Sequence, residues 1–409
     1  MPSDGPERQG KHDYHDGNHK ESQLKNLAAG SRLSFVSLLI AALLAVGACS
    51  DSRDASFEVF PEIPEFIDEV ILMNQLQYLG THNSYHIQPR ADIFELLLAF
   101  VADLAPTLAY THVPLTEQFE SQGIRQIELD VFHDPNGGLY ADHQGRTLFG
   151  EEAASGIAAL DQPGLKVLHV QEVDYETTCY TLVACLEEIK LWSDANPDHL
   201  PIMILVEAKD EAIPDPLNLN FTIPVAFGLT ALNLIDSEIR SVFANERIIL
   251  PDDIRGDFST LEGAVLSRGW LPLSEARGKV MFGLDNGGNT RDLYVQGYPS
   301  LEGRVLFTDS PAGSAEAAFM KKNDPQGNPG EITMLVEQGY MVRTRADADT
   351  EQSRSGDTTR RDAALASGAQ FISTDYPVPN PEFSDYQVTI PGGGIARCNP
   401  VNAPDSCEL

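Results

Sequence analysis

Short apolar runs recur along the chain, and stretches of helical periodicity separate them. The apolar runs are bounded by turn residues, which is typical of strands. Strands are predicted at Gln77–Gly80, Ile124–Phe132, Leu165–Gln171, Pro201–Lys209, Lys279–Leu284, Arg304–Phe307, Tyr340–Arg345 and Gln370–Ser373. Helices are predicted at Asp92–Leu104, Tyr180–Ala195, Leu229–Ala244, Thr260–Ser267 and Thr359–Ser367. Strands that alternate with helices indicate an α/β fold with a parallel sheet.

The number of strand–helix units favours a closed (β/α)8 barrel of the TIM type over residues 71–377. A doubly wound sheet is the alternative, but no glycine-rich phosphate loop follows the first strand. Residues 378–409 are rich in Pro, Gly and Asn and contain two cysteines. We interpret them as a C-terminal extension closed by a disulfide and not as a separate domain.

The N-terminal region indicates export from the cytoplasm. Residues 1–31 are polar and are interpreted as disordered or as an overlong gene start. Residues 32–48 contain an apolar run that is too short for a membrane span and suits a signal peptide. The run ends in Val-Gly-Ala-Cys-Ser, which resembles a bacterial lipobox with Cys49 as the lipidated residue. An ordinary signal peptide cut nearby is the alternative, and residues 49–70 are predicted to be an acidic tether.

Charge and cysteine content narrow the class of protein. The chain has 409 residues, is 42% apolar and carries a net charge of −33. Such an acidic chain is not expected to bind nucleic acid, because phosphate contacts need clustered Lys and Arg. The spacing of the other four cysteines favours two short-loop disulfides in an oxidising compartment, Cys179 with Cys185 and Cys398 with Cys407. We expect an exported, lipid-anchored monomer at the periplasmic or outer surface.

A polar turn follows the first predicted strand. The stretch Gln75–His86 turns polar at once after Gly80 and presents His82, Asn83 and Ser84 side by side. Barrel enzymes place their chemistry at the carboxyl ends of strands in this way. A Thr-His-Asn-Ser run alone is equally compatible with a turn capped by Asn. The functional interpretation therefore depends on the polar residues at later strand ends.

Acidic residues occupy two later predicted strands. Glu128 and Asp130 are two residues apart, so strand alternation places both on one face, where two carboxylates need a cation or water. Glu207 lies near the end of another strand. With Asn83 these residues supply oxygen ligands, which suit calcium or magnesium and not zinc. A solvated acidic rim is the alternative interpretation.

Two histidines at strand ends predict acid–base chemistry. His82 leads the first polar turn, and His169 follows the apolar run Leu165–Leu168. Histidines that flank an oxygen-ligand metal suit catalysis at a phosphodiester. His143 competes with His169 for the second role. The role of His86 stays open, and we interpret the other three histidines as surface or loop residues, namely His112, His133 and His199.

The polar strand ends resemble the phosphatidylinositol-specific phospholipase C family. The likeness is greatest to its calcium-dependent bacterial branch, which is related to the X region of the eukaryotic enzymes. It extends over about residues 74–377 and is specific through the order and spacing of its motifs. The motifs are Gly-Thr-His-Asn-Ser-Tyr at 80–85, Glu-Leu-Asp at 128–130, Lys-Val-Leu-His at 166–169, Cys179 with Cys185, Trp-Ser-Asp-Ala-Asn-Pro at 192–197 and Val-Glu-Ala-Lys-Asp at 206–210.

The resemblance implies roles for the candidate residues. His82 would be the first catalytic histidine and His169 the second, with His143 as runner-up because its distance after Asp130 suits the eukaryotic spacing. The implied calcium ligands are Asn83, Glu128, Asp130 and Glu207.

The resemblance also implies a mechanism. Calcium would neutralise the phosphate and ease deprotonation of the inositol hydroxyl, which then attacks intramolecularly, with a ligand carboxylate as the base. His82 would stabilise charge on the phosphoryl oxygens, and His169 would protonate the departing diacylglycerol. The products would be diacylglycerol and a cyclic or open inositol phosphate.

These motifs do not indicate which lipid head group the protein would recognise. The basic cluster with which eukaryotic enzymes recognise polyphosphorylated inositol has no clear counterpart, although Lys209, Arg343 and Arg345 at strand ends could contact a phosphate. A glycerophosphodiester phosphodiesterase on the same barrel is one alternative, but those enzymes usually begin with a His-Arg-Gly turn. A non-catalytic surface barrel that binds calcium is the other.

Overall fold

The computed structural model describes residues 68–327 and 329–408. These residues belong to the second of the two units into which the chain divides, Arg53–Leu409. The predicted start region, signal peptide and lipidation site at Cys49 lie outside the described residues, as does most of the tether. They therefore stay predictions.

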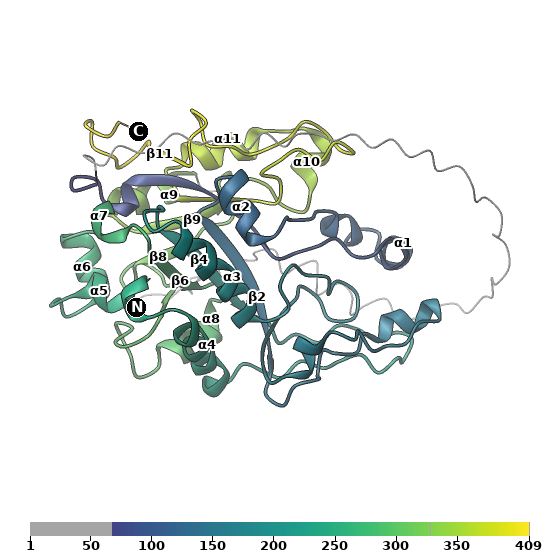
Figure 1. The fold of residues 1–409 in the computed structure, drawn as a ribbon. Coiled ribbons are helices and arrows are strands. Elements are labelled where there is room, and N and C mark those ends of the chain that lie inside the picture. Colours follow the sequence, from purple (N-terminus) through teal and green to yellow (C-terminus); the bar gives the residue numbers. More distant parts are fainter. Residues whose placement is uncertain (1–67, 328, 409) are drawn as a thin grey trace, which may run out of the picture. The chain divides into compact units, whose positions relative to one another are not determined.

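Eleven strands of the described part form one sheet, most of it parallel (Figure 1). They are β1 (Leu76–Thr81), β2 (Gln126–Asp134), β3 (Gly164–Val167), β4 (Ile202–Ala208), β5 (Ile248–Ile249), β6 (Val280–Leu284), β7 (Leu306–Thr308), β8 (Phe319–Lys321), β9 (Met341–Arg345), β10 (Phe371–Thr374) and β11 (Ala396–Cys398). The residues of β1, β4, β6 and β10 are nearly all buried. Strands covered on both faces read as continuous apolar runs, which is why the sequence pattern predicted them.

A closed ring of parallel strands forms the centre of the described chain. The order around it runs β6-β4-β2-β1-β10-β9-β8, and β7 pairs with the other edge of β6 through Phe282 and Leu306. An isolated parallel bridge between Asp309 and Phe319 joins the end of β7 to β8 and completes the ring. The predicted (β/α)8 barrel is confirmed.

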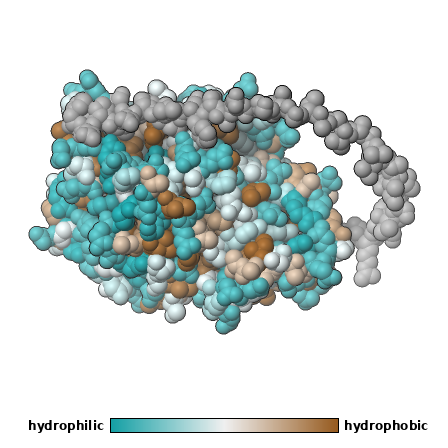
Figure 2. Space-filling view, viewed as in Figure 1, coloured by the Kyte–Doolittle hydropathy of each residue, from teal (hydrophilic) through white to brown (hydrophobic). Residues whose placement is uncertain are grey.

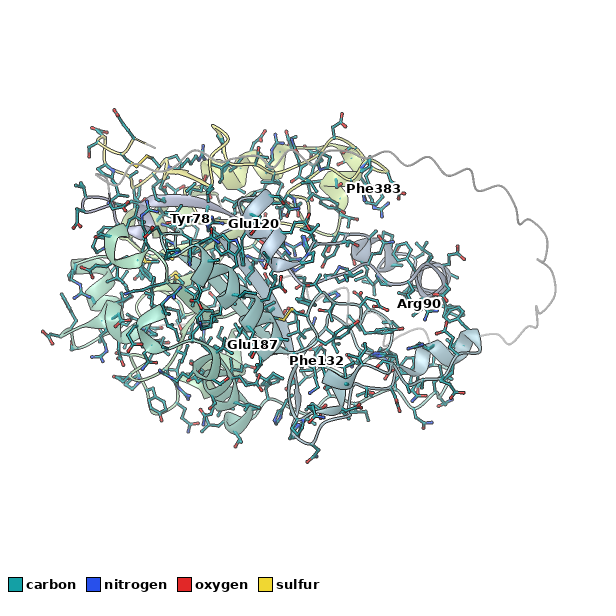
Figure 3. All side chains as sticks on the ribbon, viewed as in Figure 1. Tyr78, Arg90, Glu120, Phe132, Glu187 and Phe383 are labelled. Atoms are coloured by element: carbon teal, nitrogen blue, oxygen red, sulfur yellow. A yellow bond between two sulfur atoms is a disulfide. The ribbon has the colours of Figure 1, made fainter. Side chains whose placement is uncertain are left out.

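The membership of the ring differs from the prediction at one strand. The run Leu165–Gln171 was expected to be a barrel strand, but β3 pairs antiparallel with the outer part of β2, as Val131 opposite Val167 shows. The eighth barrel strand is instead β8, which has three residues and therefore too little alternation to predict from sequence. Phe132, labelled in Figure 3, lies on this extension of β2 and packs with Tyr140 and Leu168 in a small separate cluster.

Helices surround the ring. They are α1 (Ala91–Phe100), α2 (Leu115–Ser121), α3 (Leu182–Ala195), α4 (Leu229–Val242), α5 (Pro251–Arg255), α6 (Leu261–Ser267), α7 (Leu273–Ala276), α8 (Gly288–Val295), α9 (Pro329–Gln338), α10 (Glu351–Ser355) and α11 (Thr359–Ala366). Short 3-10 helices are η3 (Met73–Gln75), η4 (Ala105–Leu108), η5 (Gln144–Phe149), η6 (Ala158–Asp161) and η7 (Asn245–Arg247). The five predicted helices correspond to α1, α3, α4, α6 and α11, although α1 ends at Phe100 and not at Leu104.

Helix α3 shows why the longer helices were predictable. Its buried residues include Leu182, Leu186, Ile189 and Trp192, the three- and four-residue spacing of one helical face. The side chain of Thr181 caps the first turn by accepting a hydrogen bond from the Ala184 amide at 3.1 Å. Most of the helices that the pattern did not predict have eight residues or fewer. Such helices are too short to show a clear repeat of apolar residues every three or four positions.

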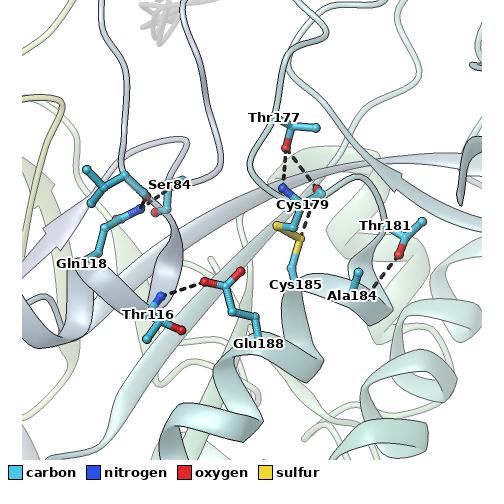
Figure 4. The surroundings of a disulfide bond; sticks show 10 residues. Ser84, Thr116, Gln118, Thr177, Cys179, Thr181, Ala184, Cys185 and Glu188 are labelled. Carbon is cyan, nitrogen blue, oxygen red and sulfur yellow. Dashed lines mark hydrogen bonds between the residues drawn. A yellow bond between two sulfur atoms is a disulfide. The ribbon is translucent and has the colours of Figure 1, made fainter. Parts of the chain in front are cut away.

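Both predicted disulfides are formed. Cys179 and Cys185 join the chain before α3 to its first turn (Figure 4). Cys398 and Cys407 close the C-terminal segment. This segment also contributes β11, which pairs antiparallel with the first half of β1. Strand β2 does not pair with that half of β1, because β1 and β2 are paired only at Gly80 and Gln126. The C-terminal segment therefore covers an open edge of β1.

The visible face in Figure 2 is mainly hydrophilic, with hydrophobic residues in separate patches. Exposed large apolar side chains in α1 and η5 are Leu98, Phe100, Leu148 and Phe149. Among the residues that the structure describes, no helix is both long enough and apolar enough to cross a bilayer.

Candidate active site

Polar and charged side chains gather at the carboxyl ends of the barrel strands. In a parallel barrel these ends share one face, so residues far apart in sequence meet there. The residues at or just after strand ends are His82 and Asn83 after β1, Glu128 and Asp130 in β2, Glu207 in β4, Asp285 after β6, Lys321 in β8, Arg343 and Arg345 in β9, and Asp375 after β10. Asp130 lies directly opposite Glu207 in the register of β2 and β4.

Three carboxylates form a cluster that could hold a metal ion. One oxygen from each of Glu128, Asp130 and Glu207 lies within 4.8 Å of the other two. Among the described residues, neither Asp130 oxygen has a hydrogen-bond partner, although the Lys209 ammonium lies 3.1 Å from Oδ2. Two acids two residues apart on β2 therefore share one face, as the sequence predicted.

Asn83 is the fourth ligand that the sequence predicts. Its backbone has φ 43°, a left-handed conformation that Asn adopts more readily than most residues. The Asn83 amide nitrogen donates to the Tyr110 hydroxyl at 3.1 Å, whereas the buried Oδ1 has no partner in the described part of the chain. A buried acceptor without a donor is costly unless something else satisfies it.

The electrostatics of these oxygens fit a divalent cation. Burial raises the pKa of Glu128 to about 7; Arg343 opposes this rise, while Asp285 and Glu207 add to it. Burial also raises the pKa of Asp130 well above its usual value, against the charge of Lys209 and with the help of Glu207 and Glu128. A hard cation would favour the ionised forms and satisfy the unpartnered oxygens, which is what calcium does with carboxylate and amide ligands.

His82 is held in one tautomer by its neighbours. Its Nδ1 lies 2.8 Å from the Asp375 carboxylate and therefore carries the proton that it donates. Its Nε2 lies 3.4 Å from Arg345 Nη1, and because a guanidinium can only donate, Nε2 is the acceptor. Burial, then the charge of Arg345, lowers the pKa of His82 to about 3, against the opposing effect of Asp375. His82 is thus a neutral imidazole with a lone pair on Nε2.

His169 lies in a loop beyond β3 and is held by a second carboxylate. Its Nδ1 donates to Asp174 Oδ2 at 2.6 Å. Its ring meets the ring of His86 edge-on, with 5.4 Å between centroids. Tyr110 stacks on His86 at 4.2 Å and lies 6.2 Å from the ring of His82. His169 therefore belongs to a group of rings that extends to His82 and Asn83.

The comparisons with known proteins bear on this site. The model of a family described as phosphoinositide phospholipase C, Ca2+-dependent, matches residues 71–400. The chain belongs to this family. Membership makes it a calcium-dependent phosphoric diester hydrolase. Within the part of the chain that the structure describes, the carboxylates of Glu128, Asp130 and Glu207 form an oxygen cluster that suits calcium. No curated protein sequence matches the chain.

Two solved structures are similar to this chain. A calcium-dependent phosphoinositol-specific phospholipase C from the Gram-negative bacterium Pseudomonas sp., in a myo-inositol complex, is similar with a TM-score of 0.50 and 15% identity, over 83% of this chain and 100% of that one. The calcium-dependent phosphatidylinositol-specific phospholipase C from Streptomyces antibioticus has a TM-score of 0.47 and 15% identity, over 75% of this chain and 96% of that one.

His143 lies apart from these groups. Its ring stacks flat on Tyr175, with 3.6 Å between centroids, and its Nε2 is buried without a partner among the described residues. Burial and the charge of Arg146 lower the pKa of His143 to about 4. His143 thus stacks on the residue that follows Asp174, whereas His169 is hydrogen-bonded to Asp174 itself.

The three predicted phosphate contacts are each paired with an acid of the site. Lys209 pairs with Asp130, and Arg345 pairs with Asp375 at 3.1 Å. Arg343 is fully buried and donates to Glu128 Oε2 at 2.5 Å and to Ser373. Arg343 therefore orients a candidate ligand, while Lys209 and Arg345 keep some exposure toward the site.

Sequence reasoning missed several residues of the site. Asp375 lies two residues after the predicted strand Gln370–Ser373, so the rule that identified Glu207 could have identified it. Asp174 lies in the polar run after His169, where nothing in the pattern distinguishes it from its neighbours. Lys321, which pairs with Asp285, gave no signal because β8 itself was not predicted.

Proposed function

We propose that this phospholipase C cleaves phosphatidylinositol-type lipids to diacylglycerol and an inositol phosphate, with His82 and His169 as base and acid. The observation that supports this most directly is that each histidine donates a hydrogen bond from Nδ1 to a buried aspartate, Asp375 or Asp174. Both Nε2 atoms are then left for substrate. Calcium, held by Asn83, Glu128, Asp130 and Glu207, would supply positive charge at the phosphoryl oxygens and the attacking hydroxyl.

In the first step the inositol hydroxyl next to the phosphate loses its proton to Nε2 of His82. Its oxygen bonds to phosphorus while the bond from phosphorus to the glycerol oxygen breaks. His169 enters this step as an imidazolium with a proton on each ring nitrogen, and its Nε2 proton goes to the glycerol oxygen. Burial lowers the pKa of His169, which makes the imidazolium a stronger acid. This assignment differs from the one that the resemblance implied, because a neutral His82 that accepts at Nε2 suits a base and not a donor to phosphoryl oxygens. Attack within one bound molecule avoids the entropy cost of bringing two together.

Arg345 is placed to meet the phosphate. Its guanidinium lies beside His82 Nε2, where the reacting groups would bind, and its ion pair with Asp375 fixes its orientation. A guanidinium presents several donors in one plane, a geometry that matches phosphate oxygens. Lys209 would release Asp130 when calcium binds and could then face the substrate.

Exposed apolar residues support action at a lipid surface. Helix α1 follows the loop after His82 and is apolar except for Asp92 and Glu95, yet it buries only Ile93. Phe100 is 64% exposed and Leu98 is 40% exposed. The start of α1 is tied to the η5 loop by an ion pair between Arg90, labelled in Figure 3, and Glu151 at 2.6 Å. Both loops follow strands on the face that carries the site, so they would meet the bilayer together.

Replacing both Leu98 and Phe100 by Ser should lower turnover on phosphatidylinositol vesicles by at least about tenfold, because burying one such side chain is worth about 1.5–3 kcal/mol. Turnover of soluble glycerophosphoinositol, if the enzyme accepts it, or of a short-chain lipid below its micelle concentration should not change. Leu191→Ser is the matched control, because Leu191 is exposed near the end of α3 that leads to the opposite face of the barrel. Equal losses on vesicles and soluble substrate would contradict the docking role.

The proposed setting is outside the cytoplasmic membrane, with Cys49 lipidated and the barrel acting as a monomer. The two disulfides within the described residues support an oxidising compartment. A lipid anchor would also offset the net charge of −33, which opposes approach to anionic bilayers at low salt. Metabolic labelling with a radioactive fatty acid tests this proposal: wild type should be labelled and Cys49→Ala should not.

The full chain should release diacylglycerol from phosphatidylinositol vesicles in calcium and not in a calcium chelator. Glycerophosphoinositol would be assayed in parallel. Calcium-dependent cleavage of the lipid supports the phospholipase proposal. Cleavage of the deacylated diester alone would instead support the glycerophosphodiesterase alternative. Folded protein that binds calcium and cleaves neither would contradict both.

A further inference from the structure

Asp174 lies between two histidines in the interior of the site. Its Oδ2 accepts from His169 Nδ1 at 2.6 Å, and both of its oxygens lie 2.9 Å from His86 Nε2. Asp174 and His86 are fully buried, whereas His169 is partly exposed. The three side chains form a compact group in which Asp174 is hydrogen-bonded to both histidines and the two rings meet edge-on, with 5.4 Å between their centroids.

His86 faces acceptors on both sides of its ring. Nε2 faces the Asp174 carboxylate, and Nδ1 lies 3.1 Å from the backbone carbonyl of Tyr110. A carbonyl oxygen cannot donate, so both hydrogen bonds are made only when His86 carries a proton on each nitrogen. The ring of Tyr110 stacks on His86 at 4.2 Å, an arrangement that suits a cationic imidazolium.

The charge on Asp174 is consistent with this arrangement. Burial alone would raise the pKa of Asp174, but His86 and the hydrogen bonds from His86 and His169 hold that pKa below its usual value. Removing either histidine's proton would leave a buried carboxylate short of a partner, which is costly. Asp174 is therefore a fixed anion that can accept from His169 without taking its proton.

The backbone holds this group of three side chains in place. Val170 and Asp174 exchange two backbone hydrogen bonds of 2.9 Å, which close a tight loop below His169. The next residues run antiparallel to the segment after β1, where the Thr178 amide donates to the Tyr85 carbonyl at 2.9 Å. The Cys179–Cys185 disulfide then joins this segment to α3 (Figure 4). The loop that carries His169 is thus anchored on both sides of Asp174.

We propose that Asp174 and His86 are positioning residues for His169: Asp174 holds the Nδ1 proton so that Nε2 faces the departing glycerol oxygen, and His86 holds Asp174 in place as an anion. The proposal rests on the proposed function, because it needs His169 to be the acid. In the reaction the Nε2–H bond of His169 breaks as the glycerol O–H bond forms, and the Nδ1 proton stays on the ring. Neither positioning residue touches substrate.

A leaving-group comparison separates a positioning role from a structural one. The full chain and its variants would be assayed on phosphatidylinositol and on a nitrophenyl ester of inositol phosphate, whose leaving group departs without needing a proton. Asp174→Asn should lower turnover of the lipid by about 100-fold or more, in the range for loss of a general acid, and turnover of the nitrophenyl ester by less than about tenfold. His169→Ala should show the same selectivity, and His86→Gln a weaker form of it, about tenfold on the lipid.

Control variants test whether the loss is specific. His199→Asn and Asp134→Asn alter a buried histidine and a buried aspartate outside the site, and both should leave the ratio of the two rates unchanged. Asp174→Glu keeps the charge and replaces Asp174→Asn if that variant does not fold by circular dichroism.

The outcomes distinguish this proposal from the one on which it rests. Equal losses on both substrates for Asp174→Asn would make Asp174 merely structural and overturn the inference. A selective loss in His169→Ala with none in Asp174→Asn would overturn the inference and leave the proposed function standing. No loss in His169→Ala would overturn both.

Discussion

Replacing His82 by Ala is expected to lower kcat on phosphatidylinositol by about 1,000-fold, within the range that a positioned base contributes. Unlike His169→Ala, it should slow turnover of the lipid and of the nitrophenyl ester equally, because both reactions need the inositol hydroxyl to be deprotonated before the leaving group departs. Burial and Arg345 lower the pKa of His82 to about 3, so the base form is present throughout the neutral range. Initial rates at saturating substrate and calcium measure the effect.

The partner of His82 offers a second variant. Asp375→Asn keeps the size of the side chain but presents an amide to Nδ1, which would favour the tautomer with its proton on Nε2. We expect turnover to fall by about 100-fold, less than for His82→Ala, because the imidazole remains. His199→Asn is the matched control, since His199 is buried and hydrogen-bonded to Ser193 outside the site. A loss below about tenfold in His82→Ala would remove His82 from the role of base.

Calcium is expected to stabilise the fold, and more strongly at higher pH. In calcium-free protein the pKa of Glu128 is raised by burial, so protonation of Glu128 stabilises the folded state relative to the unfolded state. That contribution to stability is complete below its ordinary pKa of 4.5 and is lost as the pH rises through about 7. Calcium binds the ionised carboxylates, so the increase in the free energy of unfolding that it causes should grow over the same interval. At about 100 times its dissociation constant, calcium should add about 2.7 kcal/mol.

Asp130→Asn tests the same cluster at one ligand. The variant should lose calcium-induced stabilisation and lower activity by about 100-fold or more, because it removes a charged ligand. In calcium-free protein the stability of the variant relative to wild type should increase as the pH rises. Burial raises the pKa of wild-type Asp130, so ionising it at higher pH destabilises the wild-type fold, whereas Asn does not titrate. Lys209 loses a partner in the variant but can reach solvent, since it is 17% exposed.

Chemical denaturation with and without calcium, at about pH 5 and about pH 8, measures these differences. Asp134→Asn is the control on the same strand, because its side chain caps a turn through the amides of Gly137 and Leu139 and lies outside the carboxylate cluster. If Asp130→Asn kept the full calcium effect, the assignment of β2 to the metal site would be wrong.

The sequence alone determined the barrel and the four candidate ligands. Strands buried on both faces are continuous apolar runs, and helices that pack on them repeat every three or four residues, so both are local patterns. Alternation along β2 places Glu128 and Asp130 on one face without reference to any other strand. Where the pattern was too short, as in β8, or where an apolar run formed a hairpin, as in β3, local information did not determine which strand enters the ring.

Only the tertiary structure decided which residues act on the two histidines. Asp375 is 293 residues from His82, and Arg343 is 215 residues from Glu128, so no spacing in the sequence indicates these pairs. His143 and His169 were both candidates for the second histidine, but the loop after β3 brings His169 into hydrogen-bond contact with Asp174, whereas His143 stacks on Tyr175. Hydrogen bonds and burial depend on which strand ends meet, whereas periodicity depends only on neighbours along the chain. The sequence therefore determined the barrel and its candidate ligands, and the fold determined the protonation and orientation of the histidines.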